Sequence, residues 1–160
     1  MKIKRISAAL VIAVAICALI AIGGAQFSAR GDDSYHNQLA GSWEVTVMPN
    51  GGGSIIDYAT FHEGGGMTNI DPDPNLSAGI GSWERTGPNR FTVTFVHFLS
   101  DQGTPLGSLK VRGDMTYDSQ TDTFSGPFRT DVVIGGNVVQ SICGTVQFRR
   151  LSVEAVEECS

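Results

Sequence analysis

Apolar and polar residues alternate one by one along most of the chain between residues 41 and 150. Successive side chains of a β-strand point to opposite faces, so this alternation is typical of strands that bury one face. Within residues 90–99, one face carries Phe91, Val93, Phe95, His97 and Leu99. No helical spacing interrupts the pattern, and the sequence therefore predicts an all-β domain.

Turn-forming residues divide the alternating region into eight segments. Runs such as Pro49-Asn50-Gly51 and Gly87-Pro88-Asn89 suit hairpin turns, because Gly and Asn tolerate positive φ and Pro presets a corner. The expected strands are 41–48, 54–62, 66–70, 79–86, 90–99, 106–117, 123–133 and 137–150. Eight sequential antiparallel strands form two packed sheets or a closed barrel, and closure removes exposed edges. We therefore expect an eight-stranded antiparallel up-and-down barrel.

The first 25 residues have the pattern of a signal peptide. Three basic residues precede an apolar run from residue 8 to residue 22, and the small residues Gly23, Gly24 and Ala25 follow. The run is shorter than the roughly twenty residues that a membrane-spanning helix needs. We expect cleavage after Ala25 and a secreted or periplasmic protein, with an uncleaved membrane anchor as the alternative. The other expected parts are a flexible leader (26–40), the barrel (41–150) and a C-terminal tail (151–160).

The chain is acidic, with 16 Asp and Glu against 11 Lys and Arg and a net charge of −5. Without the three basic residues of the signal peptide, the net charge becomes −8. Such a surface repels nucleic acids and anionic lipids, so we expect no nucleic-acid partner and no membrane contact outside the N-terminal segment. Cys143 and Cys159 are the two cysteines after residue 25. In an oxidising compartment they either form a disulfide or remain two separate thiols.

Two short motifs resemble the calycin arrangement of lipocalins and their relatives. Gly41-Ser42-Trp43 opens the first expected strand, and Arg149-Arg150 closes the last. In that family, the tryptophan packs beneath an arginine of the last strand and seals one end of the barrel. The resemblance thus implies structural roles for Gly41, Trp43, Arg149 and Arg150. The allene oxide cyclase-like barrels, which include small cyclases, are similar in strand count and are the alternative relative.

Aromatic residues are the best candidates for a ligand pocket, because small-molecule sites are mostly apolar with a few polar groups. The expected lining residues are Trp83, Phe91, Phe95, His97, Phe124 and Phe128, each of which could equally belong to a packed core. His97 and Glu84 are weaker candidates for a catalytic acid or base. No metal-ligand spacing occurs, and neither a metal nor a cofactor is expected.

The sequence supports three hypotheses of function. The first is a barrel that binds a small hydrophobic molecule in its interior. The second is a cyclase or isomerase in which the barrel positions a flexible substrate beside an interior acid. The third is a filled barrel whose outer surface binds a protein partner.

Overall fold

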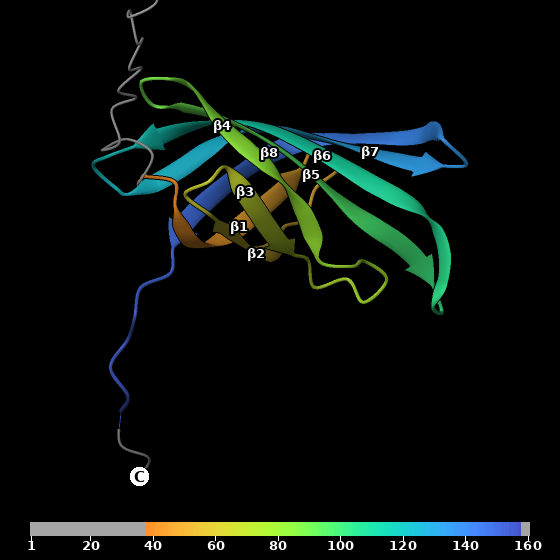
Figure 1. The fold of residues 1–160 in the computed structure, drawn as a ribbon, viewed down its shortest axis with the longest axis horizontal. Helices are drawn as coiled ribbons and strands as arrows, with labels where there is room; N and C mark the ends of the chain where they lie inside the picture. The colour runs from red at the N-terminus through yellow and green to blue at the C-terminus, as the bar shows by residue number, and fades with distance from the viewer. Residues whose placement is uncertain (1–37, 158–160) are drawn as a thin grey trace, which may run out of the picture. The chain divides into compact units, whose positions relative to one another are not determined.

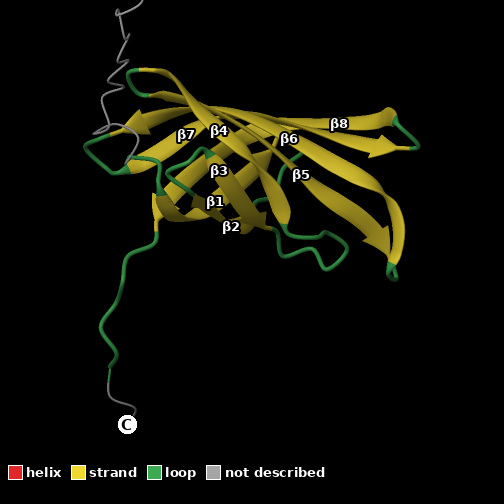
Figure 2. Cartoon of the chain, in the orientation of Figure 1, coloured by secondary structure: helices red, strands yellow, loops and turns green. Residues whose placement is uncertain are grey.

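The computed structural model describes residues 38–157, which form eight strands joined by turns and loops (Figures 1 and 2). The strands are β1 (Gly41–Pro49), β2 (Ile55–Phe61), β3 (Gly66–Ile70), β4 (Gly79–Gly87), β5 (Arg90–Asp101), β6 (Thr104–Asp118), β7 (Thr123–Ile134) and β8 (Asn137–Arg150). Their bounds differ from the predicted ones by at most two residues. The expected signal peptide, its cleavage position and residues 26–37 of the expected leader lie outside the described residues.

The strands form a closed barrel in sequence order. Every neighbouring pair is antiparallel, and β1 closes the barrel by pairing with β8 from Trp43–Arg150 to Pro49–Gly144. The predicted eight-stranded antiparallel barrel is therefore confirmed. Closure matters physically because it satisfies the backbone hydrogen bonds that the first and last strands would otherwise expose.

The two ends of the barrel differ. We call the end that holds the start of β1 and the end of β8 the closed end, and the opposite end, beside the 71–78 connection, the open end. β5 to β8 have 12 to 15 residues, whereas β1 to β4 have 5 to 9. The β5–β6 and β7–β8 hairpins therefore extend beyond the shorter strands and end in separate tips (Figure 1). The open end is consequently uneven.

The closed half of the interior is filled by an aromatic cluster. Its fully or almost fully buried rings come from six strands: Trp43, Phe61, Trp83, Phe91, Phe124 and Phe148. Many of the rings meet edge to face, as Trp43 and Phe124 do with centroids 5.0 Å apart. Such pairs contribute about 0.5–1.5 kcal/mol each beyond the burial of their area. This half of the barrel is a packed core.

Arg150 seals the closed end. Its guanidinium carbon lies 4.1 Å from the Trp43 ring centroid, and its nitrogens donate to the backbone carbonyls of Gln38 and Ala40 and to Asp122. Gly41 has a φ of 122°, and a side chain there would come within 2.9 Å of the guanidinium. Arg149 points outward and pairs with Glu44 at 3.0 Å.

The last residues of the expected flexible leader belong to the folded domain. Leu39 is fully buried, and its carbonyl accepts a 2.9 Å hydrogen bond from Trp43 Nε1. Together with the contacts of Arg150 to Gln38 and Ala40, this fixes residues 38–40 across the closed end. The alternation pattern missed Leu39 because it lies before the first strand.

The outer face carries a compact charged cluster on β6, β7 and β8. Asp131 accepts hydrogen bonds from Arg129 at 2.8 Å and Ser141 at 2.7 Å, and it also pairs with Arg112. The Ser141 hydrogen bond and the two arginines lower the pKa of Asp131 to about 2. This carboxylate is thus held in its charged form by its neighbours.

Candidate functional site

The inner wall of the open half carries three buried polar side chains among apolar ones. Asp57 on β2, Asn69 on β3 and His97 on β5 all point inward, and they are 7%, 2% and 2% exposed. Few polar side chains are buried in proteins without a partner or a function. We call these three residues the polar row.

Strand register brings the polar row together. Asn69 lies opposite Ala59 of β2 and opposite Gly79 of β4, so it is a diagonal neighbour of Asp57. The His97 ring lies over Gly79, where a Cβ atom would come within 2.9 Å of His97 Nε2. The missing side chain at Gly79 therefore lets the imidazole extend across β4 towards Asn69.

The 71–78 connection fixes the orientation of His97. Its Nδ1 lies 2.7 Å from the carbonyl oxygen of Ser77. A carbonyl only accepts hydrogen bonds, so Nδ1 must carry a proton and donate it. In the neutral ring, Nε2 is then a hydrogen-bond acceptor on the side that lies over Gly79.

Two oxygens of the polar row have no hydrogen-bond partner. The Asn69 amide nitrogen makes long contacts to Asp57 Oδ2 at 3.5 Å and to the Tyr58 carbonyl at 3.4 Å, which leaves Asp57 Oδ1 and Asn69 Oδ1 buried and unpartnered. A buried unsatisfied polar group costs about 1–3 kcal/mol. A molecule that supplied donors at this place would recover that free energy.

The environment also changes the acidity of Asp57. Burial and, to a lesser extent, the nearby Asp71 carboxylate raise the pKa of its carboxyl from 3.8 to about 7, although the Asn69 amide opposes the shift. Burial penalises the charged form because an isolated carboxylate loses its hydration. Asp57 is therefore an acid that exchanges its proton close to neutral pH.

Apolar side chains surround the polar row on the inner face. Val47, Phe95 and Ile142 point inward and are only partly buried, although they pack against the core. The Phe95 and His97 rings meet edge to face with centroids 5.4 Å apart. These side chains give the inner face beside the polar row an apolar character.

The six residues expected to line a pocket lie in different parts of the barrel. Phe95 and His97 lie together beside the polar row, and Phe128 is 7% exposed between the two halves. Trp83, Phe91 and Phe124 belong to the aromatic cluster, where the Trp83 indole nitrogen donates to the His62 carbonyl at 3.0 Å.

Sequence reasoning did not select Asp57 or Asn69. The alternation pattern could have indicated that Asp57 points inward, because Asp57 lies on the same face of the strand as Ala59 and Phe61. A carboxylate on an otherwise apolar face is unusual, and that pattern could have singled it out.

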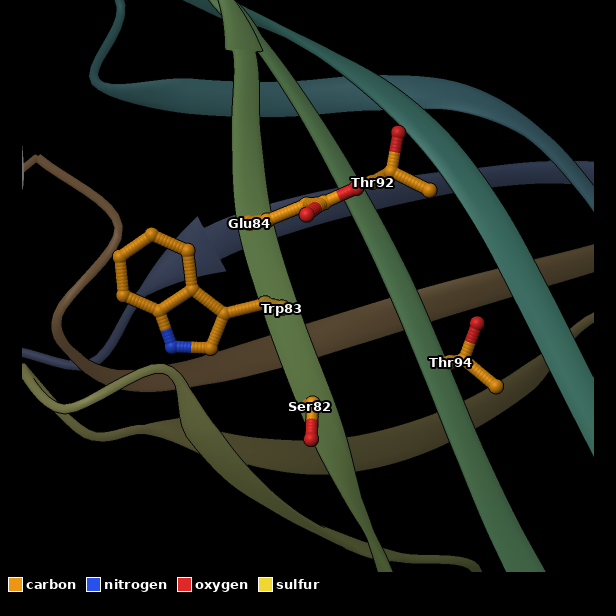
Figure 3. A pocket seen from close by; sticks show the side chains of 5 residues that line it. All are labelled: Ser82, Trp83, Glu84, Thr92 and Thr94. Atoms are coloured by element: carbon orange, nitrogen blue, oxygen red, sulfur yellow. The ribbon is translucent and has the colours of Figure 1, made fainter.

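Glu84 lies outside the barrel interior. With Ser82, Thr92 and Thr94 it lines an outer pocket of about 160 Å³ between β4 and β5 (Figure 3). The Trp83 indole extends from β4 away from the two threonines (Figure 3). Glu84 therefore cannot serve as an interior acid, and that expectation is corrected: Asp57 and His97 are the buried titratable groups of the inner wall.

Three further features concern residues 38–157. Cys143 is exposed on β8, but Cys159 lies outside the described residues, so the disulfide stays a prediction. No group of three or more potential metal ligands occurs in this part of the chain. Nor does it contain a helix with the length and apolar character needed to cross a bilayer.

Comparison with known proteins supports the fold. No family model matches the chain, and no curated protein matches it either. Among solved structures, EF1p2_mFAP2b bound to DFHBI is similar over 74% of this chain and 98% of that chain, with 18% identity and a TM-score of 0.55. A redesigned β-barrel, b11L5F_LGL, is 20% identical over 73% of this chain and 95% of that chain, with a TM-score of 0.45.

Proposed function

We propose that this protein is an exported barrel that binds one small, largely apolar molecule in the open half of its interior. The observation that carries the proposal is the pair of unpartnered oxygens, Asp57 Oδ1 and Asn69 Oδ1, buried beside inward-facing apolar side chains. Small-molecule sites combine an apolar lining with a few placed polar groups in this way. The structural neighbour EF1p2_mFAP2b was solved bound to DFHBI, which agrees with small-molecule binding by a barrel of similar fold.

The calycin resemblance supports the same proposal. Arg150 lies over Trp43 as in the arrangement that closes lipocalin barrels, and the closed end leaves the opposite end for ligand entry. Export is proposed from the basic and apolar pattern of residues 1–25. A ligand carrier that works outside the cytoplasm would need both an export signal and a barrel with one end left for ligand entry.

A filling substitution tests the proposal. The neutral dye Nile red, which fluoresces in apolar surroundings, is titrated into the protein and into two variants. Ile142→Trp adds volume on the inner face of the open half, whereas Ile80→Trp adds the same side chain on the outer face, where Ile80 is 66% exposed. We expect saturable binding that Ile142→Trp abolishes and Ile80→Trp preserves. Absence of binding, or equal binding by both variants, would contradict the proposal.

A cyclase or isomerase is the second candidate, and the acidity of Asp57 favours it. A carboxyl with a pKa of about 7 can donate and accept a proton near neutral pH, as a general acid–base group must. Isomerisation conserves mass, so the test is NMR of a linear unsaturated epoxide before and after incubation. Turnover that Asp57→Asn abolishes would favour the enzyme, and recovery of unchanged compound would favour the binding protein.

The third hypothesis, a filled barrel acting only through its outer surface, has less support. Such a barrel has no need of buried polar groups in its interior, because they cost stability unless they are paired. The polar row is therefore better explained by a ligand than by packing alone.

A further inference from the structure

We infer that the ligand is an organic cation, with an apolar body and one protonated amine or amidine that donates hydrogen bonds to Asp57 and Asn69. This inference rests on the proposed function and names the class of molecule that the same site would take. Two independent features of the polar row carry it: the kind of hydrogen-bonding atoms it presents, and the charge around them.

The free atoms of the polar row are hydrogen-bond acceptors. Asp57 Oδ1 and Asn69 Oδ1 have no partner, and His97 Nε2 accepts in the neutral ring because Nδ1 donates to the Ser77 carbonyl. The Asn69 amide nitrogen already faces Asp57 and the Tyr58 carbonyl. While Asp57 is ionised, a ligand with only acceptors, such as a ketone or a carboxylate, would find no hydrogen-bond donor among these atoms. A ligand with several N–H donors would find complementary partners.

Asp57 also lacks a basic partner within the described part of the barrel. The inward-facing arginines, Arg85 and Arg150, lie near the closed end, where Arg85 donates to the Gly87 carbonyl and Arg150 to Asp122. The contact with Arg150 lowers the pKa of Asp122, whereas the pKa of Asp57 is raised. The difference has a simple cause, because an opposite charge favours the ionised carboxyl and burial alone disfavours it.

A cationic ligand would supply that missing partner. Charge-assisted hydrogen bonds to a carboxylate are shorter and stronger than neutral ones, and their strength grows where water is excluded. The net charge of −5 also attracts cations from solution. An amine with an apolar body would thus match both the polar row and the apolar side chains around it.

Proton exchange follows from this pairing. The ammonium binds the carboxylate form of Asp57, so binding below pH 7 must release the proton that the acid carries. The charged group near Asp57 is the Asp71 carboxylate after β3, the Asn69 amide lies beside it on β3, and β1 presents the apolar Val45 opposite it. Protonation of Asp57 removes an acceptor and a negative charge, so binding of a cation weakens as the pH falls.

Three ligands that share one apolar body test the inference: 1-naphthylmethylamine, 1-naphthalenemethanol and 1-naphthoic acid. Isothermal titration at pH 7.5 compares their affinities for the wild-type protein. We expect the amine to bind about tenfold or more tightly than the alcohol, and the acid to bind most weakly. Equal affinities, or tightest binding of the acid, would overturn the inference and leave the proposed function standing. If none of the three ligands binds and Nile red does not bind either, the proposed function fails and the inference falls with it.

A matched pair of variants assigns the effect to Asp57. Asp57→Asn and Glu63→Gln each remove one negative charge, but Glu63 lies in an exposed turn at the closed end. Asp57→Asn should weaken amine binding about tenfold and leave alcohol binding nearly unchanged, and Glu63→Gln should change neither. Equal effects of the two variants on amine binding would show that net charge, not the polar row, selects the cation.

Wild-type protein alone provides a second readout, so the test does not depend on how Asp57→Asn folds. Titrations of the amine at pH 6 in two buffers with different ionisation enthalpies measure the protons exchanged on binding. We expect release of close to one proton, because Asp57 is mostly protonated at that pH. Identical enthalpies in the two buffers would mean that no proton leaves, and would overturn the inference.

Discussion

Replacing Asp57 by Asn should stabilise the protein at neutral and alkaline pH but not at acidic pH. The carboxyl has a pKa of about 7 in the folded protein and 3.8 as its ordinary value. The folded state therefore binds more protons than the unfolded state between these two values, and the free energy of unfolding falls as the pH rises through this window. Below pH 4 the acid is neutral in both states and contributes no penalty.

The magnitude follows from the separation between the two pKa values. A difference of about three pH units corresponds to about 4 kcal/mol at full effect, and solvent near the open end reduces it to about 1–3 kcal/mol. Asn has almost the same shape as Asp without the charge, so the variant should lack this penalty. The gain should be absent at pH 4, should grow between pH 4 and pH 7, and should stay constant above that.

Urea unfolding followed by tryptophan fluorescence measures this difference, because Trp43 and Trp83 are both buried in the folded protein. Acids far from Asp57 contribute equally in the wild type and in Asp57→Asn, so the difference between the two curves reports on Asp57 together with its neighbour Asp71. A difference in the free energy of unfolding that stays constant from pH 4 to pH 8.5 would contradict this prediction. It would show that Asp57 reaches water in the folded state and that its burial has little effect on its ionisation.

Further predictions concern the closed end, the sheet and the outer face. Arg150→Met should lower the free energy of unfolding by about 2–4 kcal/mol, because the contact with Trp43 and the hydrogen bonds across the closed end are lost. In the same urea assay, substitution of the exposed Arg149 by Met should lower the free energy of unfolding by less than about 1 kcal/mol. Gly81→Ala should cost more than about 3 kcal/mol, since its Cβ would overlap the Thr94 carbonyl, whereas Gly51→Ala, with open space around it, should be nearly neutral by thermal unfolding. Asp131→Asn should have a lower free energy of unfolding than the wild type at pH 6. This difference should disappear as the pH falls from 4 towards 2, because the Asp131 carboxylate, whose pKa is lowered by its partners, stabilises the folded state only while it is ionised.

The architecture could be predicted from the sequence because two local signals agree. Alternation fixes which segments are strands, and the Gly, Pro and Asn runs fix where hairpins turn, so the order of antiparallel neighbours follows without long-range information. The Gly41-Ser42-Trp43 and Arg149-Arg150 motifs also indicated which segments meet. Leu39 escaped this reasoning because one buried residue before a strand has no periodic pattern.

The candidate site was predictable only in part. His97 could be placed on the inner face from the alternation of β5, and it lies there. The polar row needed information across strands, because Asp57, Asn69 and His97 meet through register and through the absence of a side chain at Gly79. Trp83 was expected to line a pocket but lies in the aromatic cluster. Alternation shows that its side chain points inward, but it does not show which half of the barrel is packed.

We propose that a small molecule binds against the polar row inside the open half. The most direct measurement is a two-dimensional NMR titration of isotope-labelled protein with 1-naphthylmethylamine, following the side-chain amide of Asn69 and the imidazole of His97. We predict saturable shifts at both groups and at the neighbouring Phe95. Shifts confined to the outer pocket around Glu84 and Thr94, with Asn69 and His97 unchanged at saturation, would contradict it.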